Sequence, residues 1–162
     1  MEQHPVKAGV TVSAPVEHAF SVFVDRITDW WPKAYTFSQD AVTQIVIEPR
    51  VGGHWYETDL RGRRLDWGEV RAFEKERRLV LSWAVSAERT QEPPERASEV
   101  EVRFRAAAPR LARVELEHRD FERHGAGAEI LRRGMASNQG WPYILRQYAE
   151  AASLTARAAL AG

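Results

Sequence analysis

The alternation of apolar and polar residues changes period twice along the chain. Val6–Val12 alternates with period two and predicts a first strand. Ser13-Ala14-Pro15 follows, with a capping hydroxyl and a proline suited to a first helical turn. Apolar residues then recur at helical spacing as far as Ile27, so we expect a helix that ends near Asp25–Asp29.

Between Ala41 and His118 the period is that of strands. Turn residues such as Gly52-Gly53 and Gly62 separate short apolar runs, a pattern typical of an antiparallel meander. Ser86–Glu99 is charged and contains two adjacent prolines, and it predicts a solvent loop or a mobile flap. The strands predicted in this region are residues 43–48, 54–60, 65–74, 78–85, 100–105 and 111–118.

After Phe121 the pattern returns to helix. Apolar positions from Ala128 to Ala152 predict the longest helix, and Pro142 predicts a kink or a restart after Asn138. The alanine-rich residues 153–162 favour a helical or frayed tail. We therefore expect one α+β domain over residues 1–162, with its core at about 6–152. In it a curved antiparallel sheet of about six or seven strands wraps around a long C-terminal helix, with one or two short helices after the first strand.

Composition narrows the classes of function. The 162 residues suit a single domain, and the absence of cysteine excludes disulfides, thiolate zinc sites and cysteine nucleophiles. Twenty-three basic residues balance twenty-three acidic ones, which argues against a nucleic-acid partner. No apolar run approaches the ~20 residues that span a bilayer, and Met1–Gly9 has no signal-peptide core. A cytoplasmic protein with no membrane span and no cofactor is the resulting expectation.

Five segments in order resemble those of a known family. They are residues 12–15, 48–55, 68–83 in two pieces, 117–118 and 140–145, and together they extend over about 10–152. The chain resembles the helix-grip fold of the START-like (SRPBCC) superfamily, which includes the birch-pollen-allergen-like proteins and polyketide cyclases. Within it, the chain is most similar to homologues of the activator of a heat-shock-protein ATPase. The resemblance implies an apolar cavity between the sheet and the long helix.

Strand alternation sorts the side chains onto two faces. His118 falls on the inner face, and burying Trp55 places Glu57 on the same face. A buried Glu57–His118 pair would raise the pKa of the histidine and could relay a proton, so these two are the candidate catalytic residues. The alternative is that each only satisfies a backbone group. The candidate ligand-binding residues are Trp31, Trp55, Trp83, Phe104, Met135, Asn138 and Trp141.

Adjacent tryptophans at 30 and 31 predict an exposed aromatic ring. Two neighbours on one helical turn cannot both face the core, so we expect one indole at a cavity entrance or an interface. A homodimer formed through such a tryptophan or through a sheet edge is an open alternative.

Two other chemistries have weak support in the sequence. His118, Asp120 and His124 could hold a metal, but their spacing fits no single helix or strand face, so we expect no metal site. Ser137 could pair with His118 as a nucleophile, but no glycine elbow surrounds it.

Three functions remain open. The first is a protein that binds a small apolar or aromatic ligand between the sheet and the last helix. The second is a cyclase, dehydratase or hydrolase that uses His118 and Glu57 in the same cavity. The third is an interaction module associated with a chaperone ATPase, which the family label suggests and which we discount because the sequence shows no strongly charged docking face.

Overall fold

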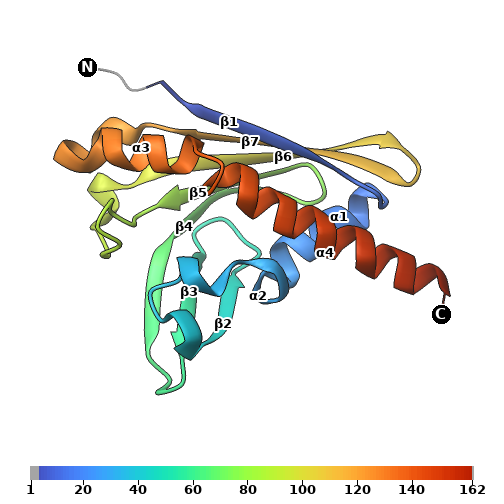
Figure 1. Ribbon diagram of the computed structural model, residues 1–162, viewed down its shortest axis with the longest axis horizontal. Helices are drawn as coiled ribbons and strands as arrows, with labels where there is room; N and C mark the ends of the chain where they lie inside the picture. The colour runs from blue at the N-terminus through green and yellow to red at the C-terminus, as the bar shows by residue number, and fades with distance from the viewer. Residues whose placement is uncertain (1–3, 162) are drawn as a thin grey trace.

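The protein is built on one antiparallel sheet whose strand order is β1-β7-β6-β5-β4-β3-β2 (Figure 1). The computed structural model describes residues 4–161. Its strands are β1 Val6–Val12, β2 Val42–Ile47, β3 His54–Asp59, β4 Arg64–Glu74, β5 Arg78–Trp83, β6 Ser98–Ala108 and β7 Leu111–Arg119. The seven strands confirm the predicted antiparallel meander and its strand count.

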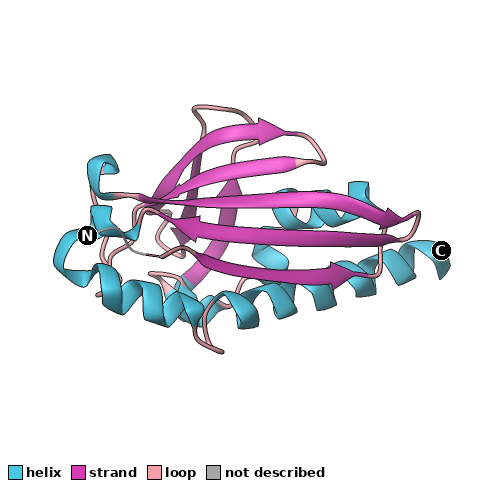
Figure 2. Ribbon diagram, turned by 90° about the horizontal axis from the view of Figure 1, so that it is seen from above, coloured by secondary structure: helices cyan, strands magenta, loops and turns pink. Residues whose placement is uncertain are grey.

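Helices cover one face of this sheet, and the long C-terminal helix runs along it (Figure 2). The α-helices are α1 Val16–Asp25, α2 Ile27–Trp30, α3 Ala128–Ala136 and α4 Trp141–Ala161. Short 3₁₀ turns are η1 Lys33–Tyr35, η2 Gln39–Ala41, η3 Pro94–Arg96 and η4 Phe121–Gly127. This is the expected helix-grip arrangement. Within residues 4–161 no helix combines the length and apolar character needed to cross a membrane.

The sheet curves because its pairing register slips in the middle strands. Shifts occur between Trp55 and Tyr56 where β3 meets β4, and between Val70 and Ala72 where β4 meets β5. Such bulges bend a strand and increase its twist. The curvature creates a concave inner face on which α4 packs. There the Tyr148 hydroxyl of α4 donates a 2.6 Å hydrogen bond to the Ala19 carbonyl of α1.

The predicted alternation of faces is confirmed by burial. Val114, Leu116 and His118 of β7 are buried inward, while their neighbours alternate outward. In β3, Trp55 and Glu57 are both buried, which confirms the choice of the inner face for this strand.

The C-terminal helical region is divided into two helices, as the restart predicted after Asn138 requires. Residues 137–140 link α3 to α4, and Pro142 lies in the first turn of α4, where its missing N–H costs no intrahelical bond. A Cβ at Gly140 would collide with the carbonyl oxygens of Gly134 and Met135, so only glycine fits this tight link. The tail is helical as far as Ala161.

Most of Ser86–Glu99, predicted as a solvent loop or mobile flap, belongs to a closed hairpin formed by residues 84–97. Val85 and Gln91 make a β-bridge, and the Ser86 hydroxyl lies 2.7 Å from the Thr90 hydroxyl. Ala97 and Ser98 at its end are fully buried. The segment therefore belongs partly to the core, although its tip is exposed.

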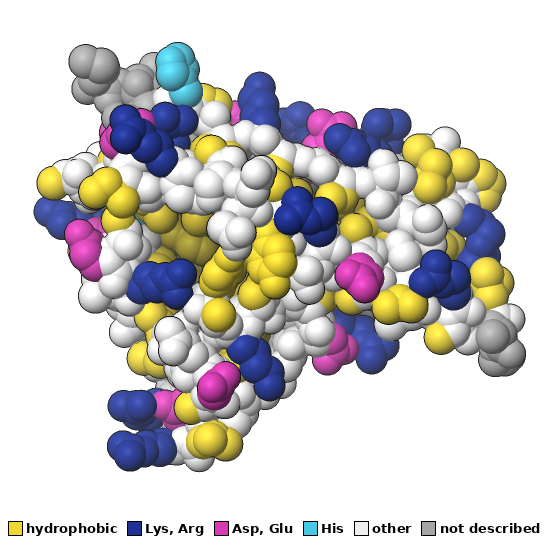
Figure 3. All heavy atoms as spheres, in the orientation of Figure 1, with side chains coloured by type: hydrophobic (Ala, Val, Ile, Leu, Met, Phe, Trp, Pro, Cys, Tyr) yellow, Lys and Arg dark blue, Asp and Glu magenta, His cyan; other side chains and the backbone are white. Residues whose placement is uncertain are grey.

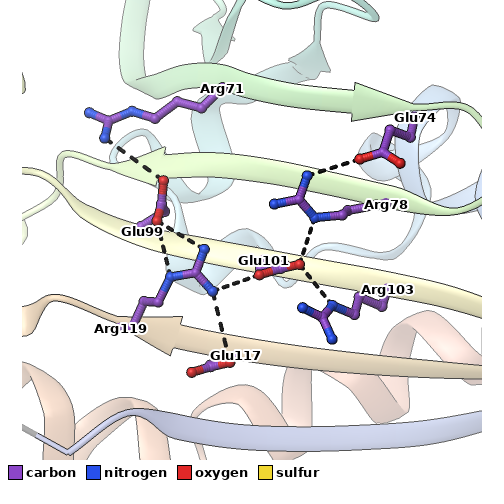
Figure 4. A network of polar contacts seen from close by, with 8 residues as sticks. All are labelled: Arg71, Glu74, Arg78, Glu99, Glu101, Arg103, Glu117 and Arg119. Carbon is purple, nitrogen blue, oxygen red and sulfur yellow. Dashed lines mark hydrogen bonds and ion pairs between the residues drawn. The ribbon is translucent and has the colours of Figure 1, made fainter.

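The outer face of the sheet carries a network of charged side chains (Figure 4). The Glu101 carboxylate lies at its centre and accepts hydrogen bonds of 2.7–2.8 Å from Arg78, Arg103 and Arg119. These three guanidinium groups outweigh the desolvation of the carboxylate and lower the pKa of Glu101 to about 2.

Candidate functional site

A cavity of about 330 Å³ opens between the start of the long helix, α3 and the ends of β4 and β5. It lies at the low end of the volume range, roughly 300–1,000 Å³, that small-molecule sites occupy. Figure 3 shows a hollow below α3 whose floor consists of hydrophobic side chains. The aromatic lining residues are Trp31, Tyr35, Phe37, Trp67 and Trp83, and the aliphatic ones include Val85, Ile130, Leu131, Met135 and Ile144.

Trp31 is the centre of a tryptophan cluster at the back of this cavity. Its ring centroid lies 5.1 Å from that of Trp67, 5.9 Å from that of Trp141 and 6.4 Å from that of Trp83. Tilted and edge-to-face contacts at these separations are favourable. The cluster therefore makes a rigid aromatic wall.

The expectation that one of Trp30 and Trp31 is exposed is wrong. Trp30 is 5% exposed and Trp31 is 4% exposed. The reason is that α2 ends at Trp30 and the next residue is already extended, with φ −67° and ψ 131°. The two rings therefore leave the chain in different directions, and Trp30 packs on Phe23 and Tyr148 instead. All six tryptophans are buried, so the structure presents no exposed indole at its surface.

Two of the six indole N–H groups have no hydrogen-bond partner. Trp30 donates to the Val22 carbonyl, Trp55 to the Ser82 carbonyl, Trp67 to Glu57 and Trp141 to His118, all within 3.0 Å. The Nε1 atoms of Trp31 and Trp83 are buried and unpartnered, and both residues line the cavity. A buried donor left unpaired costs about 1–3 kcal/mol. Two residues of the cavity wall thus each carry an unpartnered donor that is buried behind the cavity surface.

Glu57 fixes one wall of the cavity from behind. Its carboxylate accepts 2.8 Å hydrogen bonds from the Phe37 and Ser38 amides and from the Trp67 indole. The side chain is fully buried. Glu57 therefore anchors the residues after η1, which contribute Thr36 and Phe37 to the cavity lining.

His118 belongs to a different hydrogen-bonded chain, one that does not include Glu57. Indole Nε1 of Trp141 can only donate, so His118 Nδ1 accepts and the neutral ring carries its proton on Nε2. That nitrogen donates to the Ser98 hydroxyl at 2.7 Å. Ser98 in turn lies 2.7 Å from Nε2 of His124, whose Nδ1 is 2.8 Å from Glu92. This series of hydrogen bonds thus connects the long helix with the 84–97 hairpin.

The electrostatics of His118 are the reverse of the sequence-based expectation. Complete burial, together with the proximity of His124, lowers the pKa of His118 well below its ordinary value. The expected increase required Glu57 as a partner, and Glu57 is occupied by three other donors. The two residues form no joint proton relay, and neither lines the cavity. A catalytic role for either residue stays a prediction.

The candidate ligand-binding residues fall into three groups. Trp31, Trp83 and Met135 line the cavity. Trp55 and Trp141 are buried behind this wall, as the partners of Ser82 and His118. Two placements are corrected: Phe104 packs against Phe20 and Phe23, away from the cavity, and Asn138 is exposed in the α3–α4 link. Phe104 does face the inner side of the sheet, but its position in β6 is too far from the cavity to line it.

Sequence reasoning missed several residues of this region. Tyr35 and Phe37 line the cavity from irregular backbone, where no period assigns a face. Arg89 reaches the cavity because the 84–97 hairpin folds back over it. Ser98 and His124 meet His118 only through tertiary packing. The aromatic character of Tyr35 and Phe37, so close to Trp30-Trp31, was the one available signal.

No group of three histidine, aspartate or glutamate residues in the described part of the chain is arranged to hold a metal ion. His118 and His124 do approach each other, but they do so through the Ser98 hydroxyl. The hydroxyl of Ser137, the candidate nucleophile, donates to the Gly134 carbonyl at 2.8 Å.

Solved structures with the same fold include two with substantial sequence similarity. An anthrahydroquino-gamma-pyrone synthase, Txn09, complexed with SUM, is 34% identical, with a TM-score of 0.65 over 92% of this chain and 97% of that one. CalC, a self-sacrificing resistance protein from Micromonospora echinospora, is 26% identical, with a TM-score of 0.67 over 93% and 95%. Protein NE0264 from Nitrosomonas europaea, at 13% identity and TM-score 0.63, shares the fold alone. A search among curated proteins found no match.

A match to a protein-family model shows which family this chain belongs to. Residues 13–153 match the family described as "Activator of Hsp90 ATPase homolog 1-like protein". This range contains every strand except β1, together with all of α3 and the N-terminal part of α4. The chain therefore belongs to the Activator of Hsp90 ATPase homolog 1-like family, within the helix-grip (SRPBCC) superfamily.

Proposed function

We propose that this protein binds a flat aromatic small molecule with carbonyl or other acceptor oxygens in the cavity beside Trp31 and Trp83. The observation that carries the proposal is the pair of buried, unpartnered indole N–H groups on Trp31 and Trp83, two residues of a wall that is mainly aromatic and aliphatic. Aromatic rings supply the contact area, and a few placed donors orient the ligand.

Shape and volume support a ligand of a few fused rings. The cavity holds about 330 Å³ and is walled by rings from β4, β5 and η1. The relative Txn09 is named as a synthase of an anthrahydroquino-gamma-pyrone, which is a polycyclic aromatic product bearing oxygens. Its 34% identity over nearly the whole chain supports a ligand of this chemical type for the present protein.

Binding is better supported than catalysis by His118. Both ring nitrogens of His118 have protein partners, Trp141 on one side and Ser98 on the other. A general acid or base must reach the substrate within hydrogen-bond distance, whereas His118 is fully buried and outside the cavity lining. We therefore propose no enzymatic role for it.

The proposal is tested by titrating the protein with anthraquinone and following the quenching of tryptophan fluorescence. Trp83→Phe keeps a ring but removes the N–H, and we expect it to weaken binding about tenfold, the equivalent of one hydrogen bond of ~1.4 kcal/mol. Phe104→Leu is the matched control, because Phe104 contacts Phe20 and Phe23 rather than the cavity. We expect no change in its affinity.

Two results would count against this function. Failure of anthraquinone and of other oxygenated polycyclic aromatics to bind would contradict it altogether. Equal loss of affinity in Trp83→Phe and Phe104→Leu would show that the ligand does not use the cavity donors.

A further inference from the structure

Arg89 is the one charged residue among the described residues that line the cavity. It is exposed, so its guanidinium lies at the rim, whereas the unpartnered indoles of Trp31 and Trp83 lie in the buried wall. The cavity thus has a charged donor at its rim and two indoles with unpartnered donors in its wall.

The backbone places Arg89 at this rim in spite of a local cost. Its φ of 61° is left-handed, a conformation that glycine or asparagine adopts more easily. Hydrogen bonds around Ser86 hold the turn: the Arg89 amide donates to the Ser86 carbonyl at 3.0 Å, and the Thr90 amide donates to the Ser86 hydroxyl at 3.0 Å. The turn alone gives no reason for an arginine at this position.

The guanidinium is positioned but has no counter-charge. Its Nη1 donates to the Ala34 carbonyl at 2.8 Å, and its Cζ lies 5.5 Å from the Tyr35 ring centroid. These contacts orient the group across the cavity rim. They use one of the five N–H donors that an arginine offers, so others remain for a ligand.

Two of the three acidic residues of the same hairpin, Glu92 and Glu88, are directed elsewhere. The Glu92 carboxylate contacts His124 at 2.8 Å and Arg96 at 3.8 Å. The Glu88 carboxylate lies beside Gly127, within 3.9 Å of where a Cβ would stand there. Among the described residues no ion pair includes Arg89, although its hairpin neighbours carry carboxylates.

We propose that the cavity ligand carries an anionic oxygen group, such as a carboxylate or an ionised phenol, and that Arg89 binds this group and selects for it. This inference rests on the proposed binding function and adds the charge of the ligand. A guanidinium pairs with such groups through charge-assisted hydrogen bonds, which are about twice as strong as neutral ones. The ligand class is therefore an aromatic acid rather than a neutral aromatic.

The test uses two probes of one shape, anthraquinone-2-carboxylate and anthraquinone-2-carboxamide, titrated by tryptophan fluorescence at pH 7 and low salt. We expect the unaltered protein to bind the carboxylate about tenfold more tightly than the amide. Arg89→Gln should remove this preference and leave the amide affinity unchanged, while Arg89→Lys should keep part of it. Raising the ionic strength should reduce the preference, because the guanidinium is exposed.

Arg61→Gln provides the matched control, since Arg61 is an exposed arginine on the distant β3–β4 turn. It should leave the preference intact. Equal binding of the two probes to the unaltered protein would overturn the inference and leave the proposed function standing. An equal loss of affinity for both probes in Arg89→Gln would also overturn the inference, because Arg89 would then only shape the hairpin. If neither probe binds, the proposed function fails together with the inference.

Discussion

The indole N–H of Trp141 donates a 3.0 Å hydrogen bond to Nδ1 of His118, and this contact determines the tautomer of the buried histidine. It fixes His118 as the Nε2–H tautomer, which makes Ser98 an acceptor from His118, and the Ser98 hydroxyl also lies 2.7 Å from Nε2 of His124. His124 then presents Nδ1–H to Glu92. The first residue of α4 is thereby connected with the 84–97 hairpin through buried polar groups.

Replacing His118 should destabilise the protein strongly. His118→Ala leaves the Trp141 N–H and the Ser98 hydroxyl without their shared partner and opens a small void, which together should cost about 3 kcal/mol. Urea unfolding followed by circular dichroism measures the loss. His54→Ala serves as the control, because His54 is partly exposed and should change the stability by less than about 0.5 kcal/mol. Equal stability losses in the two variants would contradict the buried chain.

Acidification should destabilise the protein through His118. Burial lowers the native pKa of His118 below its ordinary 6.5, so below that pH the unfolded chain binds a proton that the native protein does not. Stability is therefore complete above about pH 6.5 and falls as the pH drops, by up to ~1.4 kcal/mol per pH unit for this group. His118→Gln should flatten this slope. Urea midpoints between pH 7.5 and 5 check the prediction, and an identical slope in the variant would contradict it.

Changing Glu57 to glutamine should disturb the cavity without removing any ring from it. The carboxylate accepts three N–H bonds, and an amide would turn one acceptor into a donor facing the Phe37 or Ser38 amide. We expect a stability loss of about 2 kcal/mol and weaker anthraquinone binding, because Thr36 and Phe37 would move. Denaturant unfolding and fluorescence titration of Glu57→Gln measure the two effects. Unchanged affinity would show that this wall does not contact the ligand.

On the outer face of the sheet, Glu101 should stabilise the protein except in strong acid. Its pKa is lowered to about 2 by three arginines, so its contribution is complete above the ordinary value of 4.5 and is lost as the pH falls towards 2. Glu101→Gln should cost about 2 kcal/mol at pH 7, and less at pH 3. Glu115→Gln is the control on the same face. The Glu115 side chain is 60% exposed, and its one ion pair, with Arg113, is long at 3.7 Å. A Glu101→Gln penalty that stays the same at pH 3 would contradict the account.

The period of the strands predicted which side chains face the inner side of the sheet. It could not predict the contacts between segments that are distant in the sequence. Alternation placed Trp55, Glu57 and His118 inward correctly, because a pleated strand allows only two directions. It could not identify Glu57 and His118 as parts of separate hydrogen-bond sets, since Glu57 binds the amides that follow η1, whereas His118 binds Trp141 of α4 and Ser98 of β6.

Positions at the ends of elements were the main source of error in the site. Trp31 is buried because α2 ends one residue earlier, and Asn138 is exposed because α3 ends at Ala136. Helical periodicity assumes that a helix continues, so it gave the wrong surroundings for Asn138 and the wrong expectation that one of Trp30 and Trp31 is exposed, although Trp31 does line the cavity. Phe104 faces inward as predicted, but its distance from the cavity depends on the length of β6 and on α1, which packs over it.

The most direct test of the account is the indole region of a ¹⁵N–¹H correlation spectrum, with and without anthraquinone. The six tryptophans give one N–H signal each, and single Trp→Phe variants assign them. The account predicts that the ligand shifts the Trp31 and Trp83 signals downfield, as a new hydrogen bond would, while the Trp30 and Trp55 signals stay in place. Unmoved Trp31 and Trp83 signals at saturating ligand would contradict the central claim that these free donors form the binding site.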